Sequence, residues 1–238
     1  FMVVGLFALA WEREFSRLLF QPLKSEAKEF LAVGLPIAAS ITLEVGLFVV
    51  AALLMGKLGS DETAAHQIVI VCASAAFMVP LGISFAGATR VGQAVGAGQR
   101  QRIRSAGLAA IAVGVAAVMV SAAIFILIPG PLVDLFWNPS QDNGLVRKLA
   151  IELFLIAGIF QLFDGLQVTS GGALRGMKDV KIPLAIALAS YWLVGLSLAA
   201  YLAFFTPLRH LGVWIGLLTG LACSGIALFV RFMLLSRP

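Results

Sequence analysis

Long apolar runs separated by short polar gaps dominate the chain. Each run holds about 20 residues, which is long enough for a helix to cross a bilayer. The alternation of apolar and polar residues at period two that a transmembrane barrel needs does not occur. The pattern therefore predicts an all-α multi-pass membrane protein with six transmembrane helices, at residues 30–58, 63–86, 105–128, 149–172, 183–205 and 212–234.

Two different segments precede these spans. Residues 1–10 are apolar but too short to span a bilayer, and no basic residues precede them as they would in a signal peptide. We expect them to be the end of a preceding transmembrane helix, with further sequence upstream. Residues 11–29 mix both charge signs with apolar residues at near-helical spacing, which is typical of a cytoplasmic linker on the membrane surface. Residues 30–238 then form the six-helix unit.

Composition agrees with a membrane location. The chain is 61% hydrophobic and 12% charged, with a mean hydropathy of +1.01, whereas soluble domains carry about 25% charged residues. The net charge is +5, and the basic residues are unevenly distributed among the loops. Of the 17 Lys and Arg, 13 lie in segments 11–29, 87–104, 173–182 and 231–238. The alternate loops hold the other four. This bias predicts that both ends of the six-helix unit, including the carboxy terminus, are cytoplasmic, and it indicates a lipid bilayer rather than a nucleic acid as the partner.

Two acidic residues lie near the middle of predicted helices. Glu44 is about 21 Å from either end of its span at 1.5 Å per residue, and Asp164 is 15 residues into its own span. A carboxylate at the bilayer centre costs about 2.5–3.5 kcal/mol on insertion scales. The pair therefore indicates proton or cation handling inside the membrane. The alternative is a protonated carboxyl that serves packing alone.

Polar and aromatic neighbours strengthen this hypothesis. Gln161, Asp164 and Gln167 follow one another at intervals of three, so this helix face must contact protein or water rather than lipid. Phe160 lies one turn before Asp164, and Phe48 lies one turn after Glu44. An aromatic ring beside a carboxylate adds cation–π attraction for an organic or alkali cation. Packing or lipid contact is the alternative for both rings.

The sequence gives little support to nucleotide binding, enzymatic catalysis or a resident metal site. The glycines of segment 90–104 lack the G-K-[ST] ending of a phosphate loop, and Ser/His/Asp, zinc-protease and kinase motifs are missing. His66 has no metal-ligand partner in its neighbourhood and is interpreted as an interfacial residue. We therefore predict a non-enzyme without cofactor or bound metal, apart from a coupling Na⁺ or H⁺ at the two carboxylates. Gly212, Gly216, Gly220 and Ser224 form a small-residue stripe suited to close helix packing.

Several motifs together resemble a known family. The chain is similar to the carboxy-terminal half of a multidrug and toxic compound extrusion (MATE) transporter of the NorM-like branch. The motifs occur in order on successive helices: GLPIAASITLEVGLF (34–48), LGSDETAAHQIV (58–69), PLGISFAGATRVGQAVGAGQ (80–99) and FQLFDGLQVTSGGALRGMKDVKIP (160–183).

The resemblance implies a twelve-helix protein in a bacterial inner membrane. Two six-helix lobes would face a central cleft and exchange Na⁺ or H⁺ for amphipathic, often cationic drugs. This chain would be the second lobe, with an amino-terminal lobe of the same protein as its partner. Glu44 and Asp164 match the family's acidic residues of the cation site. Gln67 and Phe48 match cavity residues, and Phe160, Gln161 and Gln167 are further cavity candidates.

Two alternatives to drug efflux remain. A lipid-linked precursor flippase of a related fold would be expected to line its cavity with basic residues for a diphosphate, and none of the Lys and Arg here lies mid-helix. A membrane subunit without transport activity is the other alternative. Sequence alone does not choose between Na⁺ and H⁺, because a buried carboxylate pair serves either ion.

Overall fold

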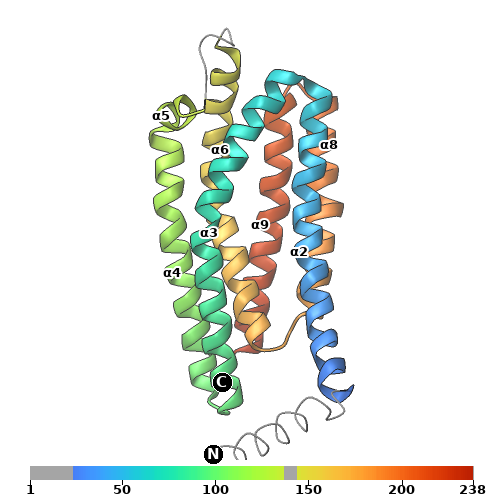
Figure 1. Cartoon of the computed structure of the whole chain (residues 1–238), viewed down its shortest axis with the longest axis vertical. Helices are drawn as coiled ribbons and strands as arrows, with labels where there is room; N and C mark the ends of the chain where they lie inside the picture. The colour runs from blue at the N-terminus through green and yellow to red at the C-terminus, as the bar shows by residue number, and fades with distance from the viewer. Residues whose placement is uncertain (1–23, 137–143, 238) are drawn as a thin grey trace, which may run out of the picture.

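The computed structural model describes residues 24–136 and 144–237, which form an up-and-down helical bundle (Figure 1). Six helical segments are long and apolar enough to cross a membrane, which confirms the predicted fold class. Five of them are single helices: α2 (Lys24–Leu58), α3 (Ser60–Gly96), α4 (Arg100–Leu127), α6 (Leu145–Gly176) and α9 (Arg209–Leu235). The remaining segment consists of α7 (Lys181–Ala187), a π-helix η1 (Leu188–Leu196) and α8 (Ser197–Phe205).

Each predicted span coincides with a helical segment, but most of these segments begin earlier or end later than predicted, and α3 continues to Gly96 rather than ending at 86. The expected helix end at 1–10 and residues 11–23 of the expected linker lie outside the described residues. The rest of that linker is helical, because α2 already begins at Lys24. The short helix α5 (Pro129–Asp134), which the sequence pattern did not predict, starts with a proline at its first position.

Helix α6 is the central element of the bundle. Glycines along it allow neighbouring backbones to approach closely. A Cβ at Gly158 or Gly165 would lie 2.5 Å from Ile126 or Val118 of α4. A Cβ at Gly172 would lie 2.6 Å from the Ser84 carbonyl oxygen of α3. The spacing of seven residues between these glycines places them along one side of α6, where side chains of α4 and the backbone of α3 pack directly against them.

The small-residue stripe of α9 packs as predicted. A Cβ at Gly220 would lie 2.8 Å from the Gly195 Cα in η1, and a Cβ at Gly216 would overlap the backbone of Ala199 in α8. The Ser190 carbonyl oxygen of η1 would also lie 2.8 Å from the Gly220 Cβ. The π-helical turn, which the sequence pattern did not predict, therefore lies where the backbones of two spans are in contact.

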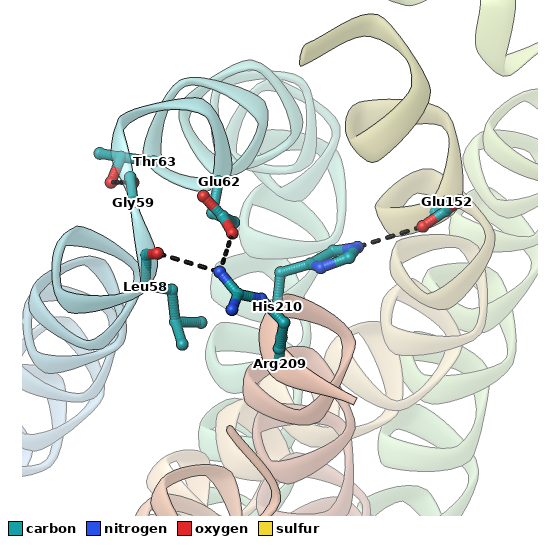
Figure 2. Close-up of polar contacts among 7 residues, drawn as sticks. All are labelled: Leu58, Gly59, Glu62, Thr63, Glu152, Arg209 and His210. Carbon is teal, nitrogen blue, oxygen red and sulfur yellow. Dashed lines mark hydrogen bonds and ion pairs between the residues drawn. The ribbon is translucent and has the colours of Figure 1, made fainter. Parts of the chain in front are cut away.

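Polar contacts connect the helices at the upper end of the bundle (Figure 2). Arg209, at the start of α9, donates to the Leu58 carbonyl oxygen at 3.1 Å and to Glu62 Oε1 at 2.6 Å. His210 Nε2 lies 3.1 Å from Glu152 Oε2 of α6. At the same end, Arg147 donates to Asp134, and this hydrogen bond lowers the pKa of that carboxyl. The α2–α3 turn, α6 and α9 are thus linked where water is close.

The basic loops lie together at the opposite end. The α3–α4 and α6–α7 connections, together with the end of α9, are at the lower end of the bundle in Figure 1. There Arg231 Nε donates to Asp179 Oδ2 at 2.5 Å. The basic loops that the sequence places on alternate connections thus lie at one end of the bundle.

We expect Gly216→Ala to destabilise the protein, because the added methyl group would overlap the Ala199 backbone. Overpacking of this kind costs about 1–3 kcal/mol. The matched control is Gly82→Ala in α3, where a Cβ meets nothing within 4 Å. Thermal unfolding of the full-length protein in detergent should give a lower midpoint for the α9 variant alone. Equal midpoints would contradict the close packing of α8 and α9.

Candidate functional site

A cavity of about 370 Å³ lies between α2, α3 and α6. Its volume is within the range of small-molecule sites in proteins. Most of its wall is apolar, with a few polar groups, which is typical of sites that orient a ligand. Five residues proposed from the sequence line it: Glu44, Phe48, Gln67, Phe160 and Asp164.

Glu44 lies on the part of α2 that is anchored to the rest of the bundle. Trp192 of η1 donates from Nε1 to the Leu43 carbonyl oxygen at 3.3 Å. The same ring packs on Gly46, where a Cβ would be only 3.2 Å away. Helix α2 continues through Pro36, and Ser40 Oγ donates to the Pro36 carbonyl oxygen at 2.9 Å. The Trp192 contacts therefore hold the α2 backbone next to Glu44 against η1, and Glu44 lines the cavity.

Asp164 is buried in the central helix α6, with 5% of its surface exposed. It lines the same cavity as Glu44, and the two carboxylates interact electrostatically. Two like charges in a poorly polarisable interior repel one another. The pair would therefore be stabilised by a cation or a proton that reduces this repulsion.

The two glutamines beside Asp164 point to different places. Gln161 is fully buried, and its Nε2 lies 3.5 Å from the Ala73 carbonyl oxygen of α3. It is not among the residues that line this cavity, and its role in the cavity stays a prediction. Gln167 is also outside this cavity and instead lines a smaller pocket beside Glu44. Within the described residues, the Oε1 atom of Gln167 is buried without a hydrogen-bond partner, and it is available to a polar ligand or to water.

Aromatic rings form a continuous chain from α2 to α9. The Phe48 and Phe160 centroids are 6.1 Å apart, and the Phe160 and Trp214 centroids are 5.8 Å apart, both edge to face. Phe160 is only 2% exposed, so the ring contacts protein rather than lipid. The packing alternative for Phe160 is therefore correct in part, since the ring both packs and lines the cavity.

His66, interpreted from the sequence as an interfacial residue, is enclosed by protein and hydrogen-bonded. It is 2% exposed and lines the cavity next to Glu44. Trp214 Nε1 lies 3.2 Å from His66 Nδ1. Because an indole nitrogen only donates, His66 Nδ1 accepts, and Nε2 carries the proton of the neutral ring. The imidazole is thus held as a neutral hydrogen-bond donor near the two carboxylates.

A larger groove of about 930 Å³ lies between α3 and α4. It contains Arg90 and Arg102 but neither of the membrane-embedded carboxylates. We place the candidate site in the cavity that Glu44 and Asp164 line, because a membrane helix with a purely structural role would not be expected to contain such charged groups.

Comparison with known proteins is consistent with this geometry. The MatE family model matches residues 36–201. The chain belongs to the MATE family. Two MATE relatives, each named as a probable multidrug resistance protein NorM, come from Pseudomonas putida and Xanthomonas campestris. They are 42% and 43% identical over 90% and 88% of this chain. The chain spans 46% and 45% of their lengths, so it matches about half of each relative.

Solved MATE structures share the fold. The eukaryotic MATE transporter AtDTX14 superposes with a TM-score of 0.79 at 26% identity, over 90% of this chain and 48% of that one. An outward-facing multidrug resistance MATE transporter gives a TM-score of 0.81 at 20% identity, over 91% of this chain and 48% of that one. MATE proteins are transporters rather than enzymes, and this chain is part of a multi-pass membrane protein.

Sequence reasoning missed three residues around the carboxylates. Trp214 and Tyr191 are fully buried, and the Tyr191 oxygen accepts from Ser224 Oγ at 3.4 Å. Arg175 lines the smaller pocket together with Glu44. The buried aromatic residues resemble ordinary membrane-helix residues in sequence, and Arg175 resembles one more basic loop residue. No local signal distinguished them.

We expect Trp214→Phe to destabilise the protein, because it keeps an aromatic ring but leaves buried His66 Nδ1 without a donor. An unsatisfied buried acceptor costs about 1–3 kcal/mol. Trp192→Phe is the matched control. It also removes an indole donor, but the Leu43 carbonyl that it frees lies within a continuous helix. The thermal midpoint should therefore fall further for the Trp214 variant, and the reverse order would contradict the assigned hydrogen bond.

Proposed function

We propose that the full-length protein exports amphipathic, often cationic drugs in exchange for Na⁺ or H⁺. In this proposal the described chain forms its second lobe. Glu44 and Asp164 would bind the coupling ion, and Phe48, Phe160 and Gln67 would contribute to the substrate side of the cavity. The observation that carries the proposal is the placement of both membrane-embedded carboxylates in the wall of one small-molecule-sized cavity.

The two halves of the exchange are coupled through this cavity. A cation or proton that reaches the carboxylates from outside favours the outward-open state and lowers the affinity for the drug. The drug must then weaken ion binding by the same factor, because coupling between two sites is reciprocal. Two negative carboxylates attract a cationic drug, whereas a bound ion removes that attraction. Competition for one charged wall is therefore sufficient to couple the two ligands.

The lining of the cavity favours drug export over a lipid-linked precursor flippase. Among the described residues, no Lys or Arg lines the 370 Å³ cavity. A diphosphate would need such positive groups to offset the two carboxylates. An organic cation finds carboxylates and aromatic rings there, which are the groups that bind it well.

The proposed location is the bacterial inner membrane, with the carboxy terminus in the cytoplasm. The relatives named NorM come from bacteria, and the basic loops lie at one end of the bundle. In this orientation the end that contains Arg209 and Glu62 faces outward. The cavity carboxylates then lie between the two surfaces, where alternating access requires an ion site to be.

We expect Glu44→Gln and Asp164→Asn, each made in the full-length transporter, to abolish gradient-driven efflux. Both changes keep the side-chain size but remove the charge that attracts the ion. Drug accumulation in cells that express either variant should rise to the level of cells without the transporter. The control is Asp61→Asn in the first turn of α3, a carboxylate that lies outside the cavity lining.

Membrane expression must be measured for all four proteins, so that a loss of efflux is not a loss of protein. Resistance that is unchanged in both cavity variants would contradict the proposed coupling site. Uphill drug transport that persists without any Na⁺ or pH gradient or membrane potential in wild-type proteoliposomes would contradict cation antiport itself.

A further inference from the structure

A second pocket lies on the other side of Glu44. It measures about 40 Å³, and its wall comes from α2, α6, α9 and the α7–η1 segment. Glu44 lines both this pocket and the 370 Å³ cavity, whereas Asp164 lines only the larger of the two. The Glu44 carboxylate is thus the wall that the two spaces share. The smaller pocket is also lined by Val180 and Pro183, which lie at the α6–α7 connection and the start of α7.

Arg175 brings a positive charge into this smaller pocket. Its Nη2 donates to Ser84 Oγ of α3 at 2.8 Å, and Ser84 Oγ in turn donates to the Val168 carbonyl oxygen at 2.9 Å. The tight approach of Gly172 to Ser84 fixes the position of this serine relative to α6. The guanidinium is therefore held by packing and hydrogen bonds rather than extended into water.

In the part of the chain that the structure describes, no acidic side chain pairs directly with Arg175. The guanidinium interacts electrostatically with Glu44. Other titratable groups around Glu44 are Asp164 on α6, His66 on α3 and Tyr191 on η1, while α9 contributes the apolar Leu228 to the pocket. Asp164 is thus the negative neighbour of Glu44, and Arg175 is the positive one.

We infer that Arg175 is a positioning residue for ion coupling: it weakens the hold of Glu44 on the bound cation and opposes passage of the cation through the smaller pocket. This inference rests on the proposed function, in which Glu44 binds the coupling ion. A cation at Glu44 is attracted by Asp164 on the cavity side and repelled by Arg175 on the other side. The arrangement keeps the ion at the cavity in which the drug also binds. It also keeps the affinity of Glu44 for the ion low enough for the ion to be released.

Removal of this charge should strengthen ion binding. In a medium of intermediate polarity, removal of one unit charge close to an ion site changes the affinity for the ion by ~10-fold. In the full-length transporter, Arg175→Gln should therefore lower the half-saturating Na⁺ concentration by ~10-fold, or move the midpoint of proton binding upward by about one pH unit. The sign follows because loss of a positive neighbour favours the protonated or cation-bound carboxylate.

Tryptophan fluorescence of the purified full-length transporter is a suitable readout. Trp192 contacts α2 next to Glu44, and Trp214 reaches the cavity through His66. Na⁺ is titrated at fixed pH, and pH is titrated without Na⁺. Arg175→Lys keeps the charge and should titrate close to wild type. Arg90→Gln removes an exposed arginine from the same end of the bundle and should leave the midpoint unchanged.

Ser84→Ala is a second test of the same inference, for use if Arg175→Gln does not fold. It keeps the arginine but removes the hydroxyl that holds it, and it should shift the midpoint in the same direction by a smaller amount. A wild-type midpoint in folded Arg175→Gln, or an equal shift in Arg90→Gln, would overturn the role of Arg175.

Glu44→Gln separates the two proposals. If it titrates like wild type, the proposed coupling site fails, whereas if it loses the transition while Arg175→Gln is unaffected, only the present inference fails.

Discussion

The close approach of α6 to its neighbours is the constraint on which the lobe depends. Polar side chains in a bilayer must be enclosed by protein, and α6 carries Gln161, Asp164 and Gln167 at membrane depth. The Gln161 side chain meets the Ala73 carbonyl oxygen of α3, and Gln167 lies against Gly225 of α9, so neighbouring helices cover this stripe. Without that cover the stripe would face hydrocarbon, and a carboxylate at this depth would be costly. Packing therefore makes the candidate site possible before any ligand is considered.

The site is built between one firmly packed helix and one less enclosed helix. Asp164 lies on the central α6, whereas Glu44 lies on α2, whose apolar residues Leu35, Val45 and Leu53 are exposed in this lobe. Trp192 connects α2 to the rest of the bundle next to Glu44. Because the two carboxylates lie on different helices, any displacement of α2 relative to α6 would change the distance between them. Alternating access would use such a movement, since ion binding must favour one arrangement of the helices.

Much of the fold could be predicted from hydrophobic spacing alone. The six spans, the small-residue stripe of α9 and the end of the bundle where the basic residues gather all follow from local properties of the chain. The π-helical turn in η1 and the helix α5 could not be predicted in this way. The π-helical turn occurs where the backbones of two spans touch, and α5 lies in a loop that hydropathy does not describe.

The sequence by itself determined that two carboxylates lie inside the membrane. A charge buried at that depth is costly whichever helix packs against it, so this conclusion does not depend on the tertiary structure. Only the tertiary structure decided which groups surround them. His66 meets Trp214 across 148 positions, and Arg175 meets Ser84 across 91. Periodicity reports which face of a helix is polar but not which distant helix covers that face. The positive neighbour of Glu44 and the neutral histidine beside it are consequences of packing between helices.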